Sequence, residues 1–154
     1  MKNRYAADTD VSISRSRSEI EQVLRRFGAT GFVYGWQGTS AAIMFELHDR
    51  RVKFVLPLPD GTEERFQRTP TGRTRKKQAI VEQAVEQEQR SRWRALLLAL
   101  KARLQSIEDG IESFEDAFLS HVVLPNGKTI GETISPQIAQ TYKTGKMPPL
   151  LGAA

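Results

Sequence analysis

The chain has 154 residues, of which 39% are hydrophobic and 27% charged, and its formal net charge is +5. This length is enough for one domain with a hydrophobic core, and the lack of cysteine excludes disulfides, thiolate zinc sites and cysteine nucleophiles. Because the first ten residues have no apolar core and no run of eighteen apolar residues occurs, we expect a cytoplasmic protein without a signal peptide or membrane span.

The N-terminal third predicts a short helix followed by three strands. Val11 and Ile13 alternate with serines and suggest a short edge strand. Ser16 with Glu19 resembles a capping box that opens a helix ending near Gly28. Three alternating runs follow and are joined by short links, which predicts an antiparallel meander: residues 32–36, 41–48 and 51–58.

Residues 60–77 have turn-forming and basic residues but no apolar period, so they predict a loop or arm. Residues 50–77 contain nine basic and three acidic residues, which is the main concentration of positive charge in the chain. Such a local excess of positive charge favours a polyanionic partner.

A long helix is expected from about Lys77 to Asp109, polar in its first half. Its second half begins a seven-residue apolar repeat that predicts a seam packed on the sheet and the first helix. The residues of this repeat are Trp93, Leu97, Leu100, Leu104, Ile107, Ile111 and Phe114.

A small unit at residues 121–154 is expected to complete the chain. Asn126-Gly127 predicts a hairpin turn, and Ser135-Pro136 predicts the start of a helix that ends near Gly145. The predicted fold is therefore a single α+β domain over residues 1–154, with an N-terminal helix, a three-stranded antiparallel meander, a long helix packed on the sheet, and a C-terminal hairpin and short helix.

The sequence offers little for catalysis. It lacks a Walker motif, GxGxxG and GxSxG. Its two histidines, His48 and His121, are far apart and sit beside apolar runs, where a structural role is the usual one. Asp60, Glu63 and Glu64 are the one acidic set placed for a magnesium nuclease, which is a minor alternative. We therefore assign no catalytic residue, metal site or cofactor.

Nucleic-acid binding has more support. Basic side chains in an arm neutralise phosphates, and aromatic side chains on a sheet stack with unpaired bases. The predicted contacts are Tyr34 and Trp36 for stacking, Arg51 and Lys53 on the third strand, and Arg68, Arg73, Arg75, Lys76 and Lys77 in the arm.

Several stretches resemble a family of small uncharacterised proteins from phages, prophages and plasmids. They include YAADT, FGATGFVYG, IMFELHDRRVKFVLPLPD and the segment from RWRALLLALK to LPNGKTIGE. This resemblance implies a mobile-element setting, with a host-cell cytoplasmic location, but no catalytic residues. The order of three strands and a long helix is also similar in outline to phage single-strand annealing proteins, an analogy of fold alone.

The expected function is therefore binding of nucleic acid, single-stranded DNA in particular, during phage or mobile-element replication or recombination. The alternative is a protein–protein interaction module that self-associates through residues 80–93 of the long helix, or that docks on a host protein to modulate defence.

Overall fold

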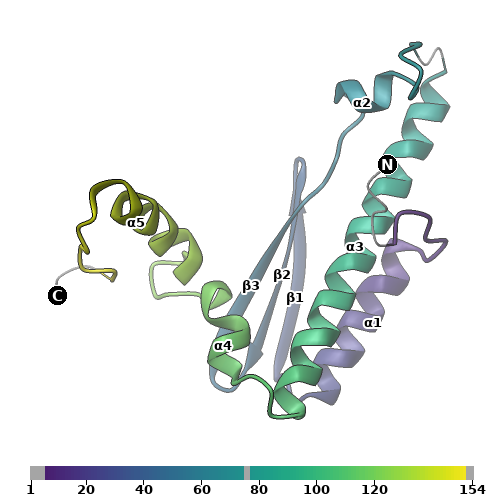
Figure 1. The fold of residues 1–154 in the computed structure, drawn as a ribbon. Helices are drawn as coiled ribbons and strands as arrows, with labels where there is room; N and C mark the ends of the chain where they lie inside the picture. The colour runs from purple at the N-terminus through teal and green to yellow at the C-terminus, as the bar shows by residue number, and fades with distance from the viewer. Residues whose placement is uncertain (1–5, 75–76, 152–154) are drawn as a thin grey trace.

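The computed structural model describes residues 6–74 and 77–151, and it is an α+β protein as predicted. Helix α1 (Ile13–Arg26) precedes strands β1 (Gly31–Gln37), β2 (Ser40–Leu47) and β3 (Arg50–Pro57). The short α2 (Glu64–Gln67) and the long α3 (Gln78–Glu108) follow (Figure 1). The chain ends with α4 (Phe114–Phe118), the 3₁₀ helix η1 (Leu119–His121) and α5 (Ile130–Thr144).

The three strands form one antiparallel sheet in the order β1-β2-β3, which confirms the predicted meander. The strand alternation separates two faces. One face carries the buried side chains of Ile43, Phe45, Val52 and Phe54. The opposite face carries residues such as Glu46 and Val55, which stay exposed. A half-buried sheet of this kind is common among antiparallel sheets.

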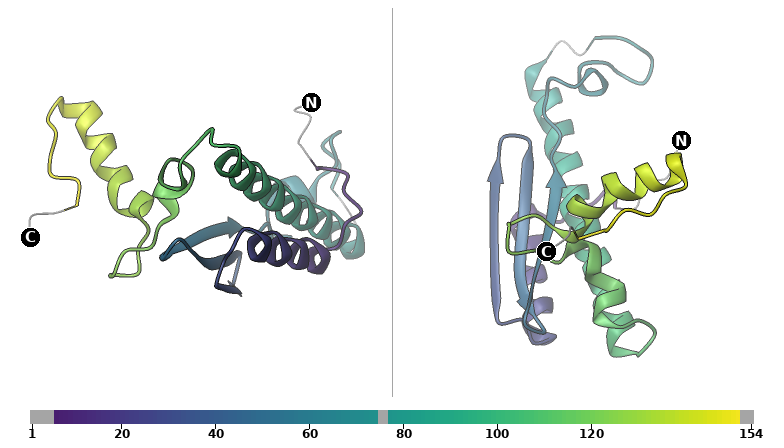
Figure 2. Two further views of the ribbon diagram at one scale, coloured as in Figure 1. Left: turned by 90° about the horizontal axis from the view of Figure 1, so that it is seen from below. Right: turned by 90° about the vertical axis from the view of Figure 1, so that its left-hand side faces the viewer.

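Helices α1 and α3 lie side by side on the buried face of the sheet (Figure 2). The helix α1 begins earlier than predicted, because the Ser12 hydroxyl accepts a hydrogen bond from the Arg15 amide at 3.2 Å and caps it. Ile13 is thus helical and forms no edge strand, and Ser16 lies one turn inside the helix, fully buried, where it cannot serve as the cap. Ile20 and Leu24 share its buried face.

The helix α3 has 31 residues, or about 47 Å of axis. The predicted seam is buried at Trp93, Leu97, Leu100 and Leu104, and Ile107 packs against the same core. Its extension to Ile111 is wrong: α3 ends at Glu108, Gly110 takes a left-handed φ of 69°, and the Ile111 side chain is 76% exposed. The turn at Gly110 breaks the helical period on which the repeat depended.

The N-terminal end of α3 extends beyond the sheet and carries α2 (Figure 1). Val81 and Phe66 are buried there. Gly61 passes so close to α3 that an added Cβ would lie 3.3 Å from a Val81 methyl group. Within residues 80–93, Val81 is thus buried against this segment and Trp93 is buried in the core, whereas Ile80 is 45% exposed.

The C-terminal segment follows the edge of β3. Ser113 and Asp116 form a reciprocal capping box at the start of α4. The predicted hairpin is reduced to a turn at Asn126–Gly127, closed by a single bridge between Val123 and Thr129.

The last helix, α5, begins at Ile130 and not at Ser135. The side chain of Thr129 caps the backbone of Glu132, and Glu132 caps Thr129 in return. Pro136 therefore lies inside α5, although Gly145 ends the helix as predicted. The tail that follows is largely exposed, with Met147 at 85%. Within residues 6–74 and 77–151, no helix is both long enough and apolar enough to cross a membrane.

Candidate nucleic-acid interface

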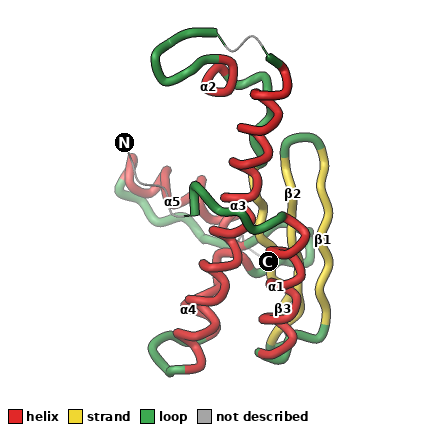
Figure 3. Tube along the Cα trace, turned by 90° about the vertical axis from the view of Figure 1, so that its right-hand side faces the viewer, coloured by secondary structure: helices red, strands yellow, loops and turns green. Residues whose placement is uncertain are grey.

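The basic arm is an ordered loop over much of its length. A bridge pairs Arg68 with Thr74, and the Thr69 amide donates to the Arg73 carbonyl at 2.8 Å. Gly72 turns the chain with a φ of 80°, a conformation that glycine adopts without steric cost. The loop stands beyond α2 at the far end of α3 from α4 (Figure 3), where it is open to a partner.

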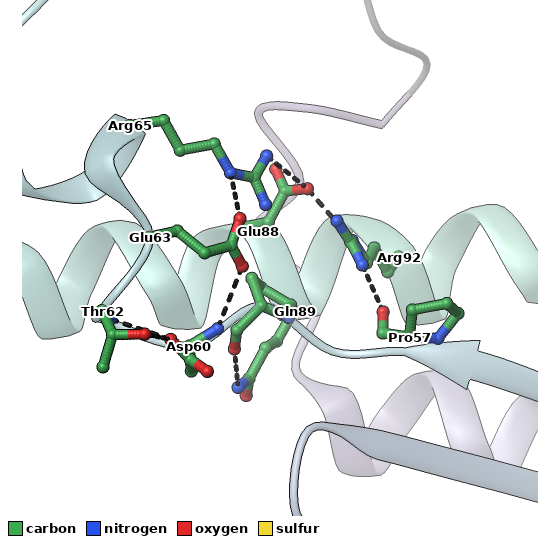
Figure 4. Close-up of polar contacts among 9 residues, drawn as sticks. Pro57, Asp60, Thr62, Glu63, Arg65, Glu88, Gln89 and Arg92 are labelled. Atoms are coloured by element: carbon green, nitrogen blue, oxygen red, sulfur yellow. Dashed lines mark hydrogen bonds and ion pairs between the residues drawn. The ribbon is translucent and has the colours of Figure 1, made fainter.

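A polar network fixes the segment before this loop to α3 (Figure 4). Glu88 of α3 lies between two arginines, 3.5 Å from Arg65 and 3.1 Å from Arg92. Arg92 in turn donates to the Pro57 carbonyl, and Gln89 donates to the Pro59 carbonyl at 3.3 Å. Since only 14% of the Glu88 side chain is exposed, these contacts are partly shielded from solvent, and they hold the start of the arm in place.

The acidic residues considered for a nuclease are used in local contacts. Asp60 binds the amide and hydroxyl of Thr62, Glu63 pairs with Arg65 at 2.7 Å, and Glu64 pairs with Arg68 at 3.2 Å. The hydrogen bond from Arg65 lowers the pKa of Glu63. Among the residues that the structure describes, no three His, Cys, Asp or Glu side chains are grouped to hold a metal ion.

Tyr34 and Trp36 lie on the outer strand β1 and point to the same side as the helices, but they remain 47% and 75% exposed. The guanidinium carbon of Arg17 from α1 lies 4.3 Å from the centre of the Tyr34 ring, a cation–π contact. Together with Gln89 and the buried Trp93 they line a pocket of about 270 Å³. An exposed tryptophan beside an open pocket gives a flat apolar surface on which a base can stack.

The aromatic pocket and the basic loop lie at the same end of the molecule. Residue Leu58, which also lines the pocket, begins the segment that leads to the loop, and its amide binds the Thr39 carbonyl of the β1–β2 turn. Gln89 lies on α3 and Lys77 is the N-cap of the same helix, twelve residues earlier, which corresponds to about 18 Å along the helix axis. One extended strand of nucleic acid can therefore contact both the aromatic pocket and the basic loop.

The structure separates the other predicted residues from this end. Arg51 and Lys53 are on the opposite, open face of the sheet, near its far end, and Arg51 is paired with Glu46 at 3.2 Å. In the loop, Arg73 and Lys77 are exposed without a carboxylate within ion-pair distance among the described residues, whereas Arg68 is paired. Arg75 and Lys76 lie outside the described residues.

Two residues of the pocket were missed by sequence reasoning, Arg17 and Gln89. Arg17 is one of several arginines in α1, and nothing in its spacing distinguishes it. Gln89 lies in a polar stretch of α3 that has no apolar period. Their importance comes from the packing of α1 and α3 on β1, which no local pattern specifies.

The pKa of His121 provides a test of the C-terminal packing. Its ring stacks on Phe54 with centroids 3.8 Å apart. Burial lowers its pKa from the ordinary value of 6.5, Arg103 lowers it further, and a hydrogen bond to the Lys53 backbone opposes them. The folded protein therefore holds fewer protons than the unfolded chain below pH 6.5, and acid destabilises it.

We expect the free energy of unfolding to fall as the pH is lowered from about 7 to 5. The variant His121→Phe, which keeps a ring against Phe54, should show a shallower fall. Urea unfolding at a series of pH values measures both slopes. Equal slopes for the two proteins would show that other groups cause the acid sensitivity.

The fold and this site define an α+β protein with an ordered basic loop and an exposed aromatic pocket at one end. In comparisons with family models, curated proteins and solved structures, no match to the chain was found.

Proposed function

We propose that the protein binds nucleic acid, single-stranded DNA in particular, and acts in the replication or recombination of a phage or other mobile element. The observation that supports this most is that exposed Tyr34 and Trp36, with Arg17, line a pocket together with Leu58 and Gln89, which connect it to the basic loop. Stacking surfaces beside a cationic track are the usual means of binding single strands without sequence preference.

The basic and the aromatic residues contact different parts of the nucleic acid. Arg68, Arg73 and Lys77, with Arg75 and Lys76, contact phosphates, and the contact releases counterions. Tyr34 and Trp36 stack with bases, which are accessible only in unpaired strands. A duplex hides the faces of its bases, so it engages the loop but not the pocket. We therefore expect preference for single-stranded over double-stranded DNA of equal length.

Fluorescence anisotropy of a labelled oligothymidine at increasing salt tests this function. With five phosphate contacts, the slope of log K against log salt is expected to be about −3.5, at about −0.7 per contact for a single strand. The double variant Arg73→Gln/Lys77→Gln should reduce its magnitude by about 1.4.

The matched control is Lys143→Gln/Lys146→Gln, which removes two exposed lysines at and just beyond the end of α5. It should leave the slope unchanged. If both double variants reduce the slope equally, binding depends on overall charge and not on the loop. Absence of binding to any DNA or RNA at low salt would refute the proposed function.

A further inference from the structure

Strand β1 is an edge strand of the sheet, and no part of residues 6–74 and 77–151 covers its outer side. It pairs with β2 on one side, and on its other side the views in Figures 2 and 3 show no described segment beside it. Residues 33–37 are all exposed. The strand, GFVYGWQ, has no charged residue and no proline, and its register with β2 runs from end to end without a bulge.

The opposite edge of the sheet, strand β3, is covered by another segment and carries charged residues and a proline. At β3, the Val123 amide donates to the Arg51 carbonyl at 2.8 Å, and Val122 bridges to Val52. The strand β3 also contains two arginines and a lysine, and it ends in a proline. Charges, proline and covering segments are the means by which proteins prevent edge strands from pairing with other chains. Among the residues that the structure describes, β3 is thus protected, and the outer edge of β1 is uncovered and able to accept another strand.

A second copy of β1 fits this edge best. Antiparallel pairing of a strand with itself requires a two-fold axis perpendicular to the sheet, which places identical residues near each other. Like charges directly opposite destabilise such a pair, and β1 has none, although 27% of the chain is charged. An axis at Gly35 sets glycine opposite glycine and Tyr34 opposite the Trp36 of the second copy.

We propose that the protein forms a dimer in which β1 pairs antiparallel with β1 of a second copy about an axis at Gly35. The two three-stranded sheets then become one six-stranded sheet, with the helices of both copies on the same face. Aromatic pairs across strands are among the stabilising ones, and Arg17 over Tyr34 lies next to the pair. The proposal does not depend on nucleic-acid binding and is tested without nucleic acid.

Gly35 also provides the sharpest test. A Cβ added there meets nothing within 4 Å, and its φ is not left-handed, so the variant G35K should fold. Glycine inside a strand is itself unfavourable. In the dimer, however, G35K sets two like charges opposite each other. The matched control is V55K, since Val55 lies in the same cross-strand row and face, on β3, and is 49% exposed.

Sedimentation equilibrium of the full chain measures the mass. We expect the unmodified protein to approach twice its 17.4 kDa, G35K to weaken the dimer by up to about fivefold, and V55K to leave it unchanged. A mixture of G35K and G35E should form a heterodimer, because opposite charges then meet at the axis. A monomer at all concentrations, equal loss with V55K, or no heterodimer in the mixture would overturn the proposal.

Discussion

Replacing Phe118 by alanine is expected to lower the free energy of unfolding by about 3–5 kcal/mol. The Phe118 side chain is fully buried. Its ring meets Phe45 and Phe54 edge to face, with centroids 5.8 and 6.2 Å apart. The alanine variant loses the free energy gained by transferring the phenyl ring from water into the core. It also loses the contacts of the residues that line the cavity left behind.

The neighbouring residue supplies the control for this prediction. Leu119 is 50% exposed, so Leu119→Ala should cost about 1 kcal/mol or less. Chemical denaturation followed by circular dichroism measures both values. A similar loss for the two variants would mean that α4 is not a part of the core, and that the sheet and α3 fold without it.

The elements that could be predicted are those whose burial follows the local period. In β2, Ile43 and Phe45 are buried, and the residues that alternate with them, Ala42, Met44 and Glu46, are half-buried or exposed on the other face of the sheet. In α3, the repeat from Trp93 to Leu104 matches the buried side of the helix. These patterns work because each element buries one face against a single neighbouring layer.

Helix starts could not be predicted in the same way, because several residues compete to cap one end. Ser12 and Ser16 are both suitable caps, and the one that precedes the whole apolar face is used. At α5, the reciprocal Thr129–Glu132 bonds form the start, and Pro136 is tolerated in the second turn. A proline at this position removes one amide donor from the helix. The helix nevertheless starts at Ile130, earlier than the predicted start at Ser135-Pro136.

The site could be predicted in its residue types but not in its arrangement. Tyr34 and Trp36 share the face of the buried Ile43 and Ala41, so alternation alone suggests a core position. They are exposed because β1 is an edge strand that the helices only partly cover. The position of a strand within the sheet depends on long-range packing, and this is also why Arg17 was missed.

Replacing Trp36 by alanine is expected to weaken binding of single-stranded DNA by about 5- to 150-fold, since one stacked base contributes about 1–3 kcal/mol. The fold should be retained, because the Trp36 side chain is 75% exposed and makes few core contacts. Its fluorescence provides a second readout. Trp93 is only 3% exposed, so quenching on DNA binding should come mainly from Trp36 and vanish in the variant.

The matched control is Tyr142→Ala, which removes an 89% exposed aromatic residue from α5, away from the pocket. It should bind like the unmodified protein, because no basic loop lies beside it.

The salt slope separates the two components of binding: Trp36→Ala should change the affinity but leave the slope near that of the unmodified protein, since no phosphate contact is lost. If Trp36→Ala and Tyr142→Ala bind equally well, stacking at β1 does not contribute, and the basic loop alone would account for the affinity.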